Sequence, residues 1–312
     1  MNQFNFFDRT HVMGIINVTP DSFSGDGILA PGVSDAKLHL KNDFIAKAID
    51  QAHSFVDAGC HILDIGAEST RPGAHPLSAS EEIDRIIPII DAVQRHVNVP
   101  ISVDTTKASV ARAAFAHGAT IINDISGLMN DPEMIDVAVQ HQCYTIIMNS
   151  QTYPFDRNMP QTLTIEETEL GGHYVEKAPV YNPHHFVACV LSDLEKRSCW
   201  ALEKGLKHDR IILDVGIGFG KTIEQNLALV ANHSLFKTLN FPLLLGVSRK
   251  SFIGYSTNAP VNQRLGGSLA ALTIGVLGGA NILRVHDVFE SVQACNLIDM
   301  VKMNAFNWCD GA

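Results

Sequence analysis

Polar side chains follow most of the short apolar runs in this sequence, and their types suit the binding of a flat, hydrogen-bonding molecule. Two runs end in the carboxylates Asp104 and Asp214, one in the amide Asn123, and two others in the cations Lys250 and Arg284. A carboxylate can accept two parallel N–H bonds from an amidine-like edge. A guanidinium can stack on a planar ring, which an ammonium does less well. The set therefore indicates recognition of a planar heterocycle.

Taken one at a time, these residues also have simpler interpretations. A lone Asp at the end of a strand often caps the next helix. The arginines, Arg71 among them, could form surface ion pairs, and His286 could be a buried core histidine. Asn17 lies near the end of a further run. The recurrence of polar groups after nearly every run favours one shared site over several unrelated ones.

The glycines near this set allow close backbone approach to a ligand. They are Gly216, Gly218, Gly220 and Gly246. They do not make a dinucleotide fingerprint, because no suitable acidic residue follows about 20 positions later. No Ser-His-Asp or Cys-His arrangement indicates a protein nucleophile.

Eight apolar runs, rich in Ile, Val and Leu, must position these residues. They lie at 12–18, 62–67, 101–103, 121–122, 144–148, 211–213, 243–247 and 282–283. Segments with apolar spacing near 3.6 predict helices at 43–58, 80–96, 107–117, 132–142, 183–204, 263–277 and 288–304. Ser80 is the expected start of one helix, and Gly118 and Gly205 are expected stops.

This alternation predicts parallel strands covered by helices. Eight units indicate a closed (β/α)8 TIM barrel, in which chemistry occurs at the carboxyl ends of the strands. We expect a single domain over 1–312, with extended loops after the first and fifth strands, at 24–41 and 150–182. Loops of this length either border a site or are insertions that are mobile or contact another subunit.

Composition narrows the class of protein. The chain has 312 residues, 46% hydrophobic and 18% charged, and a formal net charge of -10. That charge predicts no nucleic-acid and no membrane partner. No apolar run approaches the ~20 residues of a membrane span, and the N-terminus does not resemble a signal peptide. The six cysteines are scattered, so we expect no disulfide framework and a cytoplasmic location.

Several longer strings resemble the dihydropteroate synthase family. They are MGIINVTPDSFS (13–24), DIGAESTRPGA (64–74), SVDTTK (102–107), INDISG (122–127), LDVGIGFGKT (213–222), GVSRKSFIG (246–254) and LRVHDV (283–288). They occur in the family's order and span nearly the whole chain. The resemblance implies a TIM-barrel transferase of folate biosynthesis, usually a homodimer and a sulfonamide target. Such an enzyme condenses (7,8-dihydropterin-6-yl)methyl diphosphate with 4-aminobenzoate, assisted by Mg²⁺, to give 7,8-dihydropteroate and diphosphate.

The same resemblance implies roles for residues at matching positions. Those for the pterin are Asp104, Asn123, Asp214, Lys250, Met148, Phe219 and Arg284; those for diphosphate are Asn17, Arg284 and His286; those for 4-aminobenzoate are Thr70, Arg71, Pro72 and Ser251. Asn17 would also bind Mg²⁺, whose preferred ligands are oxygen atoms. Arg284, His286 and Lys250 would be the catalytic residues. Phe23 and Asp26, in the loop after the first strand, are further participants that the resemblance suggests.

The sequence also departs from the family's pattern. Asn149 stands where a His usually follows the fifth strand, Val215 replaces a Pro, and Gln225 replaces a His. The loop after the first strand reads Gly25-Asp26-Gly27 and is longer than usual. These changes leave open a second interpretation, a pterin-binding paralogue without synthase activity. A pterin-dependent methyltransferase is a third, but that class has no need of the ESTRPGA and SRKS strings.

Overall fold

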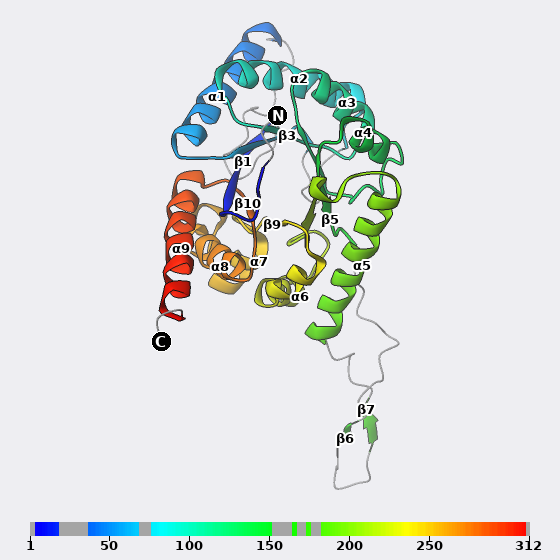
Figure 1. Cartoon of the computed structure of the whole chain (residues 1–312), viewed down its shortest axis with the longest axis vertical. Coiled ribbons are helices and arrows are strands. Elements are labelled where there is room, and N and C mark those ends of the chain that lie inside the picture. The colour runs from blue at the N-terminus through cyan, green and yellow to red at the C-terminus, as the bar shows by residue number, and fades with distance from the viewer. Residues whose placement is uncertain are drawn as a thin grey trace.

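Eight parallel strands close into a barrel in the computed structural model, with helices packed around it (Figure 1). The structure describes residues 4–18, 37–68, 76–151, 164–166, 173–175 and 182–309. The barrel strands are β1 (His11–Asn17), β2 (Ile62–Gly66), β3 (Ile101–Asp104), β4 (Ile121–Asp124), β5 (Tyr144–Met148), β8 (Ile211–Asp214), β9 (Leu243–Leu245) and β10 (Ile282–Val285). Their order around the barrel is β1-β10-β9-β8-β5-β4-β3-β2. The predicted (β/α)8 fold is confirmed.

The helices that cover the barrel lie close to the predicted ranges. They are α1 (Lys37–Asp57), α2 (Ala79–His96), α3 (Ala108–Ala116), α4 (Met134–His141), α5 (Pro183–Glu203), α6 (Ile223–Ala231), α7 (Ser251–Thr257), α8 (Leu265–Leu277) and α9 (Val288–Cys309). Short 3-10 helices occur at His208–Arg210, His233–Leu239 and Val261–Gln263. α6 and α7, of nine and seven residues, have no counterpart among the predicted helical ranges.

The start of α2 differs from the expected one. The N-cap is Ser78, not Ser80: Ser78 Oγ accepts from the Glu81 backbone N–H at 3.3 Å, and the Glu81 carboxylate accepts from the Ser78 N–H at 2.9 Å. This reciprocal pair is a capping box. Gly118 and Gly205 follow α3 and α5 with φ of 103° and 101°, so the predicted stops are confirmed.

Two apolar clusters hold the barrel together. The larger one lies between the strands and the surrounding helices. The smaller one fills the N-terminal end of the barrel and is called here the barrel floor; its buried members are Phe6, Met13, Ile62, Ile121, Tyr144, Ile146, Ile212, Leu244 and Ile282. Phe4 stacks on Phe6 with ring centroids 5.1 Å apart, and Phe6 meets Tyr144 edge-on at 5.2 Å. The N-terminal segment therefore closes this end.

The two long loops differ from expectation in extent. α1 begins at Lys37, so the helix takes up the end of the predicted 24–41 segment. The 150–182 segment contains β6 (Thr164–Glu166) and β7 (His173–Val175), which pair antiparallel. Residues 19–36, 152–163, 167–172 and 176–181 lie outside the described residues. Whether these loops border the site therefore stays a prediction.

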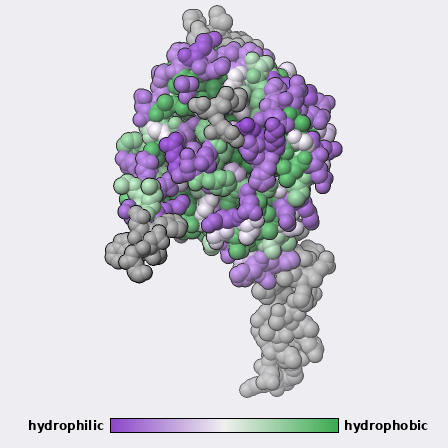
Figure 2. All heavy atoms as spheres, in the orientation of Figure 1, coloured by the Kyte–Doolittle hydropathy of each residue, from purple (hydrophilic) through white to green (hydrophobic). Residues whose placement is uncertain are grey.

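Large apolar side chains reach the surface on α8 and α9. On α9, Phe289, Leu297, Met300, Val301 and Met303 are all more than half exposed, and pale green spheres mark this side of the molecule in Figure 2. None of the helices in the described ranges is long and apolar enough to cross a membrane. The five cysteines whose side chains are described are free thiols.

Candidate functional site

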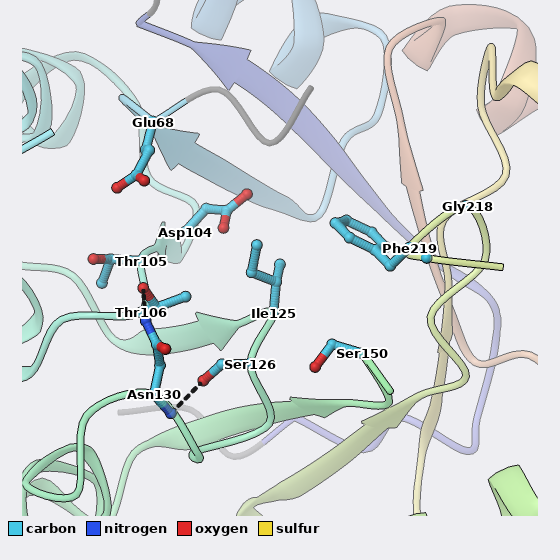
Figure 3. A pocket seen from close by; sticks show the side chains of 11 residues that line it. Glu68, Asp104, Thr105, Thr106, Ile125, Ser126, Asn130, Ser150, Gly218 and Phe219 are labelled. Atoms are coloured by element: carbon cyan, nitrogen blue, oxygen red, sulfur yellow. Dashed lines mark hydrogen bonds between the residues drawn. The ribbon is translucent and has the colours of Figure 1, made fainter. Parts of the chain in front are cut away.

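A cavity of about 480 Å³ opens at the carboxyl ends of the strands (Figure 3). Its lining residues end or follow five of the strands, β2, β3, β4, β5 and β8: Glu68, Asp104, Thr105, Thr106, Ile125, Ser126, Asn130, Ser150, Gly218, Phe219 and Gly220. In Figure 3, Phe219 lies on one side and Glu68, Thr105 and Thr106 lie on the other. Of the predicted site residues, Asp104 and Phe219 line this cavity directly. It lies at the end of the barrel where such folds carry out chemistry.

Arg284 reaches from β10 to acidic groups on β2 and β3. Its Nε donates to Asp64 Oδ2 at 2.6 Å and its Nη2 to Asp104 Oδ2 at 2.6 Å. Asn123 on β4 donates from Nδ2 to the same Asp64 oxygen at 3.0 Å. Asp64 is fully buried, whereas Arg284 and Asp104 keep 19% and 16% of their side chains exposed. Three predicted site residues therefore meet around one buried carboxylate.

The charges in this cluster shift one another's proton affinities. Burial raises the pKa of Asp104 to about 7, while Arg284 opposes that rise and Asp64 adds to it. Burial lowers the pKa of Arg284, but Asp64 and Asp104 outweigh it and raise that pKa above its ordinary value. The guanidinium therefore stays charged between the two carboxyls.

Asp214 and Lys250 form another part of the site: Asp214 ends β8, and Lys250 is the N-cap residue of α7, which follows β9. Asp214 Oδ1 accepts from the Gly216 N–H at 2.8 Å, and burial raises the pKa of Asp214 against the nearby cations Lys250, Arg284 and Lys221. Lys250 Nζ lies 4.1 Å from the centroid of the Phe219 ring, a cation–π contact. This contact connects Lys250 to the wall of the cavity.

Burial makes two lysines in this region easier to deprotonate. It lowers the pKa of Lys250 to about 8, helped by Arg284 and opposed by Asp214 and Asp104. It also lowers the pKa of Lys221 to about 8, again opposed by Asp214. Strongly shifted pKa values of this kind gather at functional sites.

The glycine string after β8 has the backbone freedom that the sequence predicts. Gly216, Gly218 and Gly220 have φ of 73°, 82° and 62°, values that side-chain-bearing residues rarely adopt. At Gly216 the glycine is also required by packing within the protein, because a Cβ there would overlap the Asn149 carbonyl oxygen. A Cβ on Gly218 would lie 2.8 Å from Lys250 Cδ. These glycines therefore permit the loops to pack on each other and on Lys250.

The remaining predicted residues are placed as follows. His286 lies after β10 with Nδ1 3.2 Å from Ser248 Oγ, Asn17 ends β1 half-buried, and Met148 ends β5 and is buried. Ser251 is exposed at the first position of α7. Thr70, Arg71 and Pro72, like Phe23 and Asp26, lie outside the described residues.

Several charged residues that belong to this end of the barrel were not among the predicted ones. Asp64 lies in the middle of β2, and Lys107 donates to Glu68 and, at 2.8 Å, to the fully buried Glu82 on α2. Lys221 donates to the carbonyls of Asn149 and Phe219 at 2.9 and 3.3 Å. The available signal for Asp64 was an acid inside a buried apolar run (ILDIG), since such a charge needs a partner.

The described residues contain no cluster of three or more His, Cys, Asp or Glu side chains that could hold a metal. Asn17 offers an amide oxygen at the mouth of the barrel. This donor suits a hard cation that takes most of its ligands from a bound phosphate group and water.

A family model described as pterin binding enzyme matches residues 13–286. A dihydropteroate synthase from a Synechocystis species is 41% identical over 297 residues, which are 95% of this chain and 91% of the relative. The Bacillus subtilis dihydropteroate synthase is 39% identical over 295 residues, covering 95% and 90%. The chain therefore belongs to the pterin-binding enzyme family.

Solved structures narrow the assignment. A dihydropteroate synthase from Clostridium difficile, solved in the presence of pteroic acid, matches with a TM-score of 0.79 and 34% identity over 96% of this chain and 98% of the other. The Xanthomonas albilineans enzyme with 4-aminobenzoic acid matches with a TM-score of 0.75 and 35% identity over 95% and 94%. Within its family, the chain is thus one of the dihydropteroate synthases, which are transferases of folate biosynthesis.

Proposed function

We propose that the cavity condenses (7,8-dihydropterin-6-yl)methyl diphosphate with 4-aminobenzoate to give 7,8-dihydropteroate and diphosphate. One observation carries the proposal. Asp104, Asn123 and Asp214 end or nearly end three strands at one mouth, and Arg284 and Lys250 supply cations among them. Acceptors for a heterocycle's N–H edge and cations for a diphosphate are thereby present in one place.

The pterin ring is recognised by its hydrogen-bonding edges. Asn123 gives its Nδ2 to Asp64, so its amide oxygen is the atom directed to a ligand N–H. Asp214 suits the 2-amino and ring N–H edge, where two donors lie side by side. Lys250 suits the O4/N5 edge, which offers acceptors. Arg284 stacks on the ring.

Two further side chains shape the pterin pocket. Phe219 lines the cavity, and Met148 is buried at the end of β5. Both supply apolar surface to the faces of the ring.

The leaving diphosphate is held by Arg284, His286 and Asn17. A Mg²⁺ ion beside the diphosphate would have Asn17 as its ligand from the protein, because Mg²⁺ binds oxygen atoms such as that of an amide. The cation supplies charge neutralisation on the diphosphate when bound. Arg284 does the same from the protein, and its geometry is fixed in advance by Asp64 and Asp104. Preorganised charge of this kind is a large contribution to catalysis.

The reaction needs no protein nucleophile. The C–O bond to diphosphate breaks, the electron pair leaves with the phosphate oxygen, and the electron-rich dihydropterin stabilises the cation on its exocyclic methylene. The neutral arylamine then forms the C–N bond and releases a proton. The residues orient both substrates and stabilise charge on the leaving group.

The proposed 4-aminobenzoate site lies at the start of α7. Ser251 opens α7 beside Lys250, and a hydroxyl with nearby backbone N–H groups suits a carboxylate. Thr70, Arg71 and Pro72 are proposed to complete this site from the loop after β2.

We further propose a cytoplasmic, single-domain homodimer that uses no nucleic-acid or membrane partner. The exposed apolar side chains of α8 and α9 support the dimer, since a second copy would remove them from water. Sedimentation of the purified protein tests this: a monomer at micromolar concentration would contradict it.

The decisive experiment is product formation by the purified protein with the pterin diphosphate, 4-aminobenzoate and Mg²⁺. We expect dihydropteroate only when both substrates are present, and diphosphate release that depends on 4-aminobenzoate. Tight pterin binding without dihydropteroate would overturn the proposal and identify a paralogue without synthase activity.

A further inference from the structure

Four polar residues behind the cavity wall form one continuous hydrogen-bonded chain. They are Asn149 after β5, Asp193 and Arg197 on α5, and Lys221 before α6; this set is called here the α5 strut. None of the four is among the residues that line the cavity. Their connections nevertheless reach three of the loops that do.

Asn149 is the centre of the strut. Its side chain is fully buried and donates from Nδ2 to Asp193 Oδ2 at 2.6 Å. Its backbone N–H donates to the Asp214 carbonyl at 2.9 Å, and its own carbonyl accepts from Lys221 Nζ at 2.9 Å. The side chain thus turns toward α5, and the backbone holds the ends of β5 and β8 together.

The strut extends in both directions from Asn149. On α5, Asp193 Oδ2 also accepts from Arg197 Nε at 2.7 Å, and Arg197 Nη1 donates to the Ser126 carbonyl at 2.9 Å. At the other end, Lys221 Nζ donates to the Phe219 carbonyl at 3.3 Å. Ser126, Ser150 and Phe219, which follow β4, β5 and β8, all line the cavity.

We propose that the α5 strut sets the separation between these three loops and thereby the width of the pterin side of the cavity. Asn149 and Asp193 are then positioning residues that act through Ser126, Ser150 and Phe219, without touching the substrate. This inference rests on the proposed function for the identity of the ligand. A displacement of about 1 Å at a site of this kind is enough to weaken binding or turnover substantially.

The bond to Asp193 explains why an Asn occupies position 149 in this chain. Asp193 keeps 13% of its side chain exposed and accepts from Arg197, and the amide of Asn149 supplies a second donor to the same carboxylate oxygen. Asn149, which departs from the family's pattern at this position, is thus engaged with α5.

The test exchanges the two partners. In Asn149→Asp, two carboxylates would face each other, and we expect the KM for the pterin diphosphate to rise at least about tenfold. The KM for 4-aminobenzoate is expected to stay within about twofold, a difference near the precision of such comparisons. In the double variant Asn149→Asp/Asp193→Asn, the carboxylate and the amide change places, and we expect most of the pterin KM to be recovered.

Three controls make the outcome specific. Arg112→Gln removes the exposed ion pair between Arg112 and Glu133 (2.9 Å) and is expected to change neither KM. Thermal unfolding of each variant shows whether it folds; if Asn149→Asp does not, Asp193→Asn alone gives a smaller rise in the same KM. Calorimetric binding of the pterin diphosphate tests the strut even if wild-type protein makes no dihydropteroate. An unchanged pterin affinity in folded Asn149→Asp, or no recovery in the exchanged pair, would overturn the proposal.

Discussion

At the N-terminal end of the barrel most strands begin with apolar side chains, whereas at the C-terminal end four of them, β1, β3, β4 and β8, finish with an Asn or Asp side chain. Ile62, Ile121 and Ile282 open their strands in the barrel floor. Asp104 and Asp214 close theirs at the cavity end, where Arg284 pairs with Asp104. The same strands therefore carry two different kinds of interaction along their length.

The difference separates what holds the barrel together from what its site requires. Floor contacts are non-directional and stabilise in proportion to the apolar area removed from water. The charged groups at the mouth lose hydration, and pairing recovers only part of that free energy. We therefore expect floor substitutions to lower stability with activity retained, and mouth substitutions to lower activity more than stability.

The largest expected effect is at the mouth. Arg284→Ala removes the guanidinium that Asp64 and Asp104 hold and that we propose binds the leaving diphosphate. We expect turnover to fall by at least about 10²–10³, roughly 3–4 kcal/mol of barrier, measured as steady-state diphosphate release. Arg284→Lys keeps a charge without the planar fork and is expected to stay well below wild type. Near wild-type turnover in Arg284→Ala would contradict the assignment of Arg284 to the active site.

The matching change at the floor is Phe6→Ala. Phe6 is 3% exposed and contacts Phe4, His11 and Tyr144. We expect the free energy of unfolding to fall by about 3 kcal/mol, with kcat unchanged below the melting temperature. Denaturant unfolding and a parallel turnover assay measure both, and Phe6→Leu is the milder control. A folded Phe6→Ala enzyme with strongly reduced kcat would break the contrast between the two ends.

The response to pH sharpens the same contrast. Burial lowers the pKa of Lys250 and of Lys221 from 10.5 to about 8. Between those values the unfolded chain binds more protons than the folded one, so the stability that these lysines contribute rises with pH. Turnover is expected to fall as the pH rises through about 8, where the folded protein loses the Lys250 ammonium.

Lys250→Met provides the check on this pH response. We expect the variant to lose part of the rise in unfolding free energy between about pH 8 and 10.5 and to be more stable than wild type at neutral pH. Chemical denaturation at several pH values measures the slope. A slope as steep as that of wild type would show that Lys250 does not carry it.

The smallest expected effect tests whether location alone matters. Ser78 lies at the cavity end of the barrel, but its capping box with Glu81 contacts none of those predicted site residues that the structure describes. Ser78→Ala is expected to lower the free energy of unfolding by about 1 kcal/mol with kcat and both KM values retained. Ser78→Asp keeps a cap and is the control. A loss of activity beyond the loss of folded protein would contradict the separation.

The fold could be predicted because the apolar runs and the residues that follow them repeat locally. The runs at 62–67 and 211–213, for example, correspond to β2 and β8 within a residue at each end. The start of α2 was wrong by two positions, because Ser78 and Ser80 both precede acidic residues and only the backbone geometry distinguishes them. The pairing of β6 with β7 left no signal, since three-residue strands are too short to show a period.

The site was predictable in its membership more than in its pairing. Asp104, Asn123 and Arg284 were identified from their places after apolar runs, and the structure brings them together around Asp64. Which acid pairs with Arg284 depends on side chains 180 and 220 positions away in the sequence, and no local pattern encodes that choice. Asn149 was recognised in the sequence only as a departure from the family's pattern. Its partner, Asp193, is 44 positions away, so no local pattern indicates their hydrogen bond.

The bond between Asn149 and Asp193 has a consequence for how this chain can be lengthened. The two residues lie at opposite ends of the segment that contains residues 150–182, and their contact fixes the distance between the end of β5 and the helix that follows. Chain added or removed between them changes loop-closure entropy only slowly with length and leaves both anchors in place. We therefore expect this segment to be an insertion site: with a foreign peptide or a small domain inserted there, the barrel should still fold.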